Sequence, residues 1–192
     1  MHQIIKNNIA EAVNATIRKM YPDEYCSLCH VYAIVGSNMA SIVLDRVYRP
    51  VSGLALIDCG RGNFIKLTDN NAFANPIGGA FHCWIESADE AFPEKEVIDF
   101  TFRHNREYAT KNKMQWHQPT PPPYLWDKHH ILVVDAELDN IPSSFPAGKV
   151  WLRETDEGWD WMTNHLAENI NAYVTLTAQA LNTYRRIHLS GV

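Results

Sequence analysis

The stretch "YPDEYCSLCHVYAIVG", residues 21–36, decides how this chain is interpreted, because it joins a helix break, two cysteines and the start of a second helix. Its proline ends an amphipathic helix, expected over residues 3–20, whose apolar side chains recur every four residues. A second helix is expected to begin near Ser27 or Cys29 and to run to about Leu44.

The centre of this stretch, Cys26-Ser-Leu-Cys29-His30, fits three kinds of site: c-type haem attachment, a redox or metal-binding CxxC pair, and a helix start that carries a thiol nucleophile. Haem attachment is disfavoured because it takes place outside the reducing cytosol and the segment leads straight into apolar residues. A zinc site is disfavoured because the second pair of ligands is missing. A redox pair stays open, since a helix start lowers a thiol pKa.

Composition and charge narrow the class of protein. With 192 residues, 46% of them hydrophobic, the chain is expected to form one domain over residues 1–192. The net charge is −5 and no Lys/Arg cluster occurs, so nucleic acid is not expected as a partner. Apolar runs are short, so no membrane association is expected. The start of the chain lacks a signal-peptide pattern, which predicts a cytoplasmic protein with free thiols.

The remaining pattern predicts an α+β fold with an antiparallel sheet packed against helices. Strands are expected at residues 46–58, 64–67, 79–87, 96–102 and 130–138, with a loop over 70–79. A short polar helix is expected at 103–112 and a long closing helix at 159–188. The proline-rich segment 113–128 is expected to be a loop.

Two of these strands offer partners for a nucleophilic thiol, which needs a base that is oriented by a third group. The strand over 79–87 carries His82, and the strand over 96–102 carries Asp99. Neighbouring strands would place the imidazole and the carboxylate side by side. A helix packed on that sheet would direct the thiol of Cys29 at the imidazole, and the helix dipole would favour the thiolate.

Four segments together resemble the transglutaminase-like, papain-related cysteine hydrolase superfamily. They are Cys29-His-Val-Tyr-Ala33, "RPVSG" ending at Gly53, His82-Cys-Trp-Ile-Glu86 and Val97-Ile-Asp99-Phe-Thr101. The resemblance spans residues 26–102 and implies a cysteine-proteinase-like core. It also implies that Cys29 is the nucleophile, His82 the base and Asp99 the orienting group, with the backbone N–H of Cys29 as one oxyanion donor.

The chain departs from the superfamily pattern near the nucleophile. Ser27 stands where many members have glycine, and Cys26 is an additional thiol. The upstream Gln or Trp that often completes the oxyanion hole has no counterpart, and Tyr25 is considered as a stand-in. Trp84 is considered as a substrate contact, or else as a packing residue that forms a lid over the imidazole.

The resulting hypothesis is a cysteine hydrolase or acyltransferase that acts on a peptide or on a small amide or ester, with no metal and no organic cofactor. Two alternatives remain: a binding module of the same fold without activity, and a redox protein that uses Cys26 and Cys29. Cys59 and Cys83 are expected to be buried packing residues.

Overall fold

The computed structural model describes residues 2–69, 71–74, 80–89 and 94–190. The longer helices are α1 (His2–Met20), α2 (Cys29–Leu44), α3 (Asn105–Lys111) and α5 (Asp156–Ser190). The shorter ones are α4 (His129–Leu132), η1 (Tyr25–Ser27), η2 (Phe102–His104) and η3 (Leu138–Asn140). The strands are β1 (Tyr48–Gly60), β2 (Asn63–Leu67), β3 (His82–Ser87), β4 (Glu96–Asp99), β5 (Leu125–Lys128) and β6 (Val150–Glu154).

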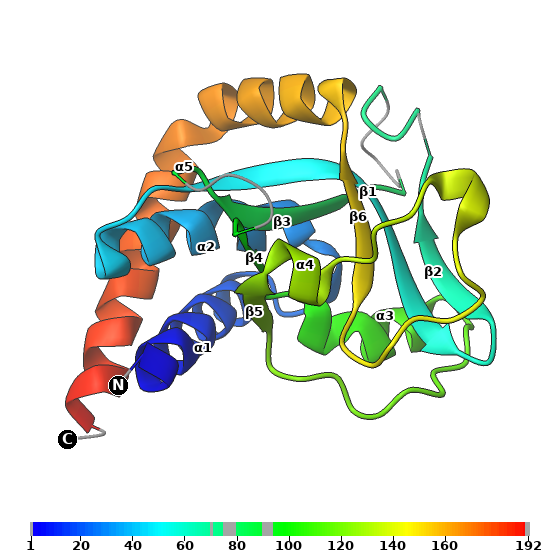
Figure 1. Ribbon diagram of the computed structural model, residues 1–192. Helices are drawn as coiled ribbons and strands as arrows, with labels where there is room; N and C mark the ends of the chain where they lie inside the picture. The colour runs from blue at the N-terminus through cyan, green and yellow to red at the C-terminus, as the bar shows by residue number, and fades with distance from the viewer. Residues whose placement is uncertain (1, 70, 75–79, 90–93, 191–192) are drawn as a thin grey trace.

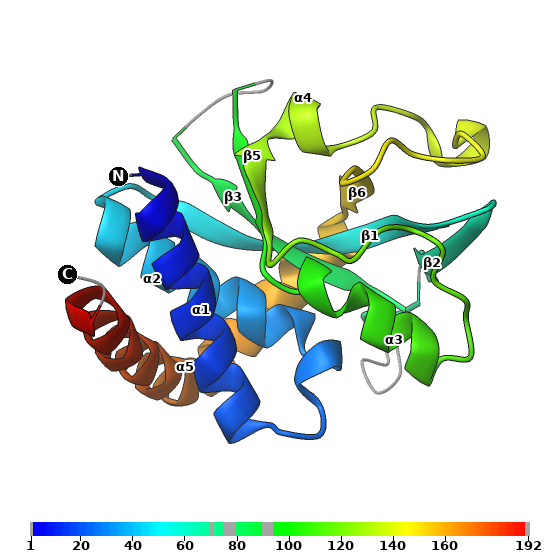
Figure 2. The ribbon, with the colours of Figure 1, turned by 90° about the horizontal axis from the view of Figure 1, so that it is seen from below.

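The strands form one antiparallel sheet in the order β2-β1-β3-β4-β5, and β6 pairs with β1 (Figure 1). The long strand β1 organises the sheet. Its first half pairs with β3 and its second half with β2 and β6. Helix α2 packs against β1 and β3 and also against α1 and α5, which gather on one side of the molecule (Figure 2). The predicted α+β class with an antiparallel sheet is confirmed.

Gly36 sets how closely α2 approaches the sheet. A Cβ at this position would lie 2.6 Å from the Phe100 ring and 2.7 Å from Ile85 Cδ1. A glycine in the middle of a helix lowers helix propensity, but here it lets the helix come close to β3. Helix α2 therefore packs closely on β3.

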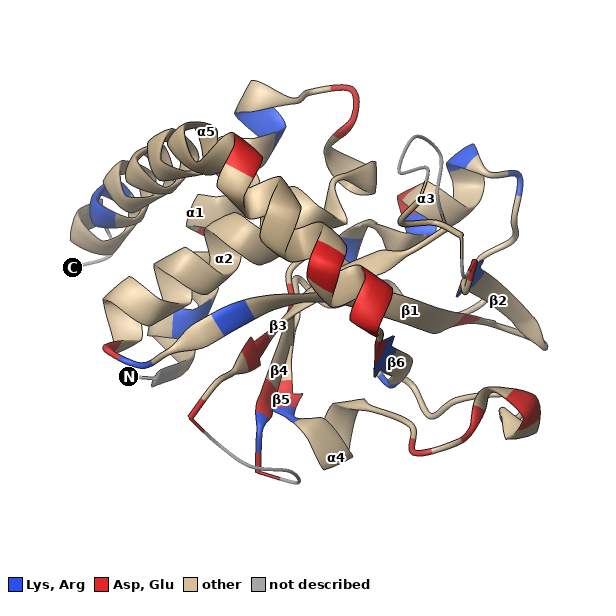
Figure 3. Cartoon of the chain, turned by 90° about the horizontal axis from the view of Figure 1, so that it is seen from above, with Lys and Arg blue, Asp and Glu red and all other residues tan. Residues whose placement is uncertain are grey.

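Charged residues pair with one another around the Ser87 end of β3 (Figure 3). Glu86 is buried and accepts hydrogen bonds from Trp84 Nε1 at 3.0 Å, from Arg49 at 3.1 Å and from Lys95 at 2.9 Å. A buried carboxylate is tolerated only when it is paired in this way. These contacts fix the position of β3 in the sheet.

Several predicted elements differ from the structure. The strand expected at 130–138 is wrong: α4 occupies its first part, and a bridge from Val133 to Val150 follows. Short apolar runs do not distinguish a strand from a buried helical turn. Strand β5 lies inside the expected loop 113–128, at the sheet edge where a nearby proline is tolerated. Strand β6 was not expected.

The ends of other elements differ from the predicted ones, or lie partly outside the described residues. Strand β4 ends at Asp99 rather than at 102, because the chain turns into η2. Residues 70 and 75–79 of the expected loop, including the start of the strand predicted at 79–87, lie outside the described residues. In the part of the chain that the structure describes, no helix has the length and apolar character needed to cross a membrane.

Candidate active site

A cleft of about 800 Å³ opens at the start of α2. Its walls come from η1, α2, β2, the start of β3 and α3, and they include Cys26, Cys29, His30, His82, Asn105 and Tyr108. Cys29 is the first residue of α2. The backbone N–H groups of the first helical turn have no partner within the helix, so this end of α2 is suited to binding an anion or a carbonyl oxygen.

The structure brings His82 and Asp99 together, as the sequence predicts. Antiparallel pairing, with Ile85 opposite Ile98 and Glu86 opposite Val97, brings the start of β3 and the end of β4 to the same end of the ladder. Nε2 of His82 lies 3.0 Å from Oδ2 of Asp99, and both side chains are buried. The other ring nitrogen, Nδ1, is thereby left for a different partner, which is the arrangement that a base oriented by a carboxylate requires.

Cys29 and His82 are electrostatically coupled. Burial by itself would lower the pKa of His82, but the charge and hydrogen bond of Asp99, with a further contribution from Cys29, raise it to about 10. The pKa of Cys29 is held well below its usual range, first by the Cys83 thiol and then, against burial, by His30 and His82. The favoured state is therefore a thiolate beside an imidazolium.

Cys83 is a site residue that the sequence reasoning missed. Both Cys59 and Cys83 are buried, as expected. Cys83 belongs to the apolar cluster against which Cys29 packs. Burial and then the hydrogen bond with Cys29 raise the pKa of Cys83. Cys83 is therefore the thiol of the pair that keeps its proton, a role that strand alternation alone did not suggest.

The other two site residues considered from the sequence have partners of their own. The hydroxyl of Tyr25 donates to Glu107 Oε2 at 2.7 Å, so it is engaged with α3. Trp84 is buried, and its ring lies nearly parallel to that of His82, with centroids 6.3 Å apart. Trp84 therefore packs in the hydrophobic core beside the imidazole and does not line the cleft.

Cys26 also lines the cleft, but its sulfur has a different environment from that of Cys29. Cys26 is buried and accepts a hydrogen bond from Lys111 Nζ at 3.1 Å. Lys111 is also paired with Glu107, at 3.3 Å. No disulfide joins Cys26 to Cys29: all four cysteines are free.

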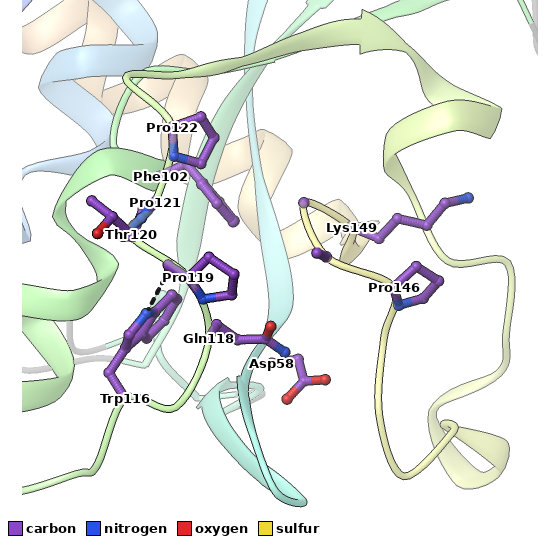
Figure 4. Close-up of a pocket in the computed structure, with 12 residues that line it drawn as sticks. Asp58, Phe102, Trp116, Gln118, Pro119, Thr120, Pro121, Pro122, Pro146 and Lys149 are labelled. Carbon is purple, nitrogen blue, oxygen red and sulfur yellow. Dashed lines mark hydrogen bonds between the residues drawn. The ribbon is translucent and has the colours of Figure 1, made fainter.

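A second, smaller cavity of about 90 Å³ lies between the proline-rich loop and the turn at 146–149 (Figure 4). Asp58 is the carboxylate in its wall, and both of its oxygens accept backbone hydrogen bonds, from Gly60 and from Phe145. Trp116 Nε1 donates to the carbonyl of Pro119. Among the described residues that line this cavity there is neither cysteine nor histidine, in contrast to the first cleft.

The described residues contain no group of three or more His, Cys, Asp or Glu side chains arranged to hold a metal ion. Beside the cleft, the carboxylate of Asp99 is instead hydrogen-bonded to the imidazole of His82, and the imidazole is electrostatically coupled to the thiol of Cys29. Such an arrangement is suited to moving a proton and activating a sulfur nucleophile.

Comparison with known proteins shows the fold but no family. No protein-family model matches the chain, and no curated protein matches it. A solved crystal structure named "genomics APC5867" is similar, with a TM-score of 0.62 and 14% sequence identity. The similarity covers 96% of this chain and 79% of the other. At this identity the likeness concerns the fold alone.

Proposed function

We propose that the chain is a cysteine-dependent acyl hydrolase or acyltransferase that acts on an amide or ester bond. The observation that carries the proposal is the buried His82–Asp99 pair, 3.0 Å apart, beside the thiol of Cys29 in a cleft. The resemblance over residues 26–102 to the transglutaminase-like, papain-related superfamily supports the same roles, with Cys29 as nucleophile, His82 as acid and base, and Asp99 as the orienting group.

In the first half of the reaction, the sulfur of Cys29 forms a bond to the carbonyl carbon while the π electron pair moves to oxygen. When the tetrahedral intermediate collapses, the bond to the leaving nitrogen or oxygen breaks. The leaving group takes the proton that His82 holds. The raised pKa of His82 suits it to carry this proton at neutral pH.

In the second half, neutral His82 accepts a proton from water as the water oxygen attacks the thioester. The carbon–sulfur bond then breaks, which releases a carboxylic acid and restores the thiolate–imidazolium pair. An amine in place of water would make the protein a transferase. A reducing compartment such as the cytoplasm would keep the thiol available.

The proposal is tested by alkylation with iodoacetamide at pH 6, with labelling of each cysteine followed by mass spectrometry. Cys29 is expected to react much faster than Cys59, whose pKa is raised by burial, and His82→Ala is expected to slow Cys29. An activated acyl ester should acylate wild type but not Cys29→Ala. Slow labelling at equal rates for all four thiols would favour the inactive binding module instead.

The redox alternative is tested by Cys26→Ala. If acylation and alkylation of Cys29 survive this substitution, Cys26 is not part of the mechanism. If a correctly folded Cys26→Ala variant is no longer acylated at Cys29, the redox alternative, which uses both Cys26 and Cys29, is favoured.

A further inference from the structure

Asn105 lies in the wall of the cleft, and the nitrogen of its buried side chain lacks a hydrogen-bond partner. It is the first residue of α3, is 6% exposed and lines the same cleft as Cys29. Its Nδ2 atom has no hydrogen-bond partner. A buried amide without a partner is destabilising, so native proteins keep few of them, and the group calls for an explanation.

The other buried side-chain nitrogen without a partner among the described residues, Nε1 of Trp126, has a different environment. Nε1 of Trp126 belongs to a ring that is surrounded by the rings of Tyr48, Phe100 and Tyr124, with centroids 5.9–6.3 Å away. Aromatic faces accept weak hydrogen bonds from N–H groups. Trp126 lines neither of the two cavities described above. Of the residues that the structure describes, only Asn105 combines an unpaired buried nitrogen with a position in the wall of one of these two cavities.

Asn105 sits on a rigid support. The preceding residue, His104, is buried, and its Nε2 lies 3.1 Å from Oη of Tyr32 on α2 and 3.2 Å from Oδ1 of Asn14 on α1. Tyr25 packs edge-on against His104 and donates to Glu107. Helix α3 is thereby held against η1, the segment that leads into Cys29 (Figure 2).

The face of α3 that carries Asn105 looks toward the nucleophile. Tyr108 lies three residues further along the helix, on the same face, and also lines the cleft. Burial raises the pKa of the Tyr108 hydroxyl, and the charge of Cys29 raises it further, so the two groups are within electrostatic reach of each other. Asn105 and Tyr108 therefore belong to the part of the cleft wall that α3 supplies, in the same cleft as Cys29.

We propose that the side-chain amide of Asn105 donates a hydrogen bond to the carbonyl oxygen of the acyl substrate and completes the oxyanion site with the backbone N–H of Cys29. This inference rests on the proposed function. A donor held in the wall of a cleft stabilises negative charge as it develops on a substrate oxygen. Tyr25, considered from the sequence for this role, instead positions α3 through Glu107.

The test separates the oxyanion site from the thiol. Alkylation by iodoacetamide forms no oxyanion, whereas acylation by p-nitrophenyl acetate does. In Asn105→Ala the rate of Cys29 acylation is expected to fall about 100-fold. The rate of Cys29 alkylation should stay within about twofold of wild type, because the thiolate–imidazolium pair is intact. Asn171→Ala, on the exposed face of α5, is the matched control and should change neither rate.

Asn105→Ser keeps a smaller hydrogen-bond donor and should recover part of the acylation rate. This second variant can be measured even if Asn105→Ala folds poorly. Acylation at the wild-type rate in Asn105→Ala would overturn the inference. A parallel fall of acylation and alkylation would overturn it too, since that result means a structural role. If Cys29 of the wild type is alkylated rapidly but is not acylated, the inference of an oxyanion site is wrong. If Cys29 is neither alkylated rapidly nor acylated, the proposed function is wrong as well.

Discussion

Thr101 holds Asp99 through two hydrogen bonds to a single carboxylate oxygen. The backbone N–H of Thr101 lies 2.8 Å from Oδ1 of Asp99, and its hydroxyl lies 2.6 Å from the same atom. The other oxygen, Oδ2, faces His82. The carboxylate therefore has a single orientation, and the residue two positions after the acid is part of what orients the imidazole.

Thr101→Val removes the hydroxyl and keeps the shape of the side chain. A hydrogen bond to a charged group contributes about 1.5–3 kcal/mol, so the coupling of Asp99 to His82 should weaken and Cys29 should be alkylated about tenfold more slowly at pH 6. Thr175→Val, at an exposed position on α5, is the control. An unchanged alkylation rate in Thr101→Val would show that the backbone N–H is sufficient.

Cys83→Ala tests whether the second thiol stabilises the thiolate of Cys29. The Cys83 hydrogen bond is the largest contribution that lowers the pKa of Cys29, so its removal should raise that pKa. We expect the rate of Cys29 alkylation at pH 5 to fall about tenfold, with convergence of the two rates at higher pH. Cys59→Ala removes an equally buried thiol and should leave the pH profile unchanged. Identical profiles for the two variants would contradict the assigned contact.

His104 makes stability depend on pH. Burial, and then the charge of Arg103, lowers the pKa of His104 from 6.5 to about 4 in the folded protein. The unfolded state binds the proton more readily, so the stabilising contribution is complete above about pH 6.5 and is lost as the pH falls through about 4. The loss attributable to this residue is about 3 kcal/mol.

Urea denaturation at pH 7 and at pH 4.5 measures this effect. His104→Gln keeps a neutral side chain that forms hydrogen bonds, and its free energy of unfolding should change less between the two pH values than that of wild type. His117→Gln, at an exposed histidine, should retain the wild-type dependence. Equal slopes for all three proteins would mean that His104 titrates normally when the protein is folded.

Gly36→Ala tests the close approach of α2 to the sheet. Helix propensity alone would make alanine stabilising by about 1 kcal/mol. The contacts of the added Cβ with Phe100 and Ile85 should instead destabilise the protein by about 1–3 kcal/mol. Chemical denaturation gives the sign directly, and a stabilised variant would show that α2 and β3 can separate without cost.

The sequence by itself determined the elements whose signals are local. The four-residue repeat and the proline at position 22 marked α1 and its end, and α2 begins at Cys29 and ends at Leu44, within the expected limits. His82 and Asp99 were identified because an imidazole and a carboxylate stood in adjacent strand patterns, and antiparallel pairing is the ordinary result for neighbouring strands.

Tertiary structure alone decided which other groups meet these residues. Strands β5 and β6 form because a sheet edge supplies hydrogen-bond partners, which no local pattern encodes. Cys83 reaches Cys29 because α2 packs tightly on β3, and Asn105 joins the cleft because α3 is held against η1 by Tyr25 and His104. The spacing of residues along the chain predicts which side chains share a face of one helix or strand. The side chains that meet in a cleft come from separate elements, so how those elements pack decides which of them meet.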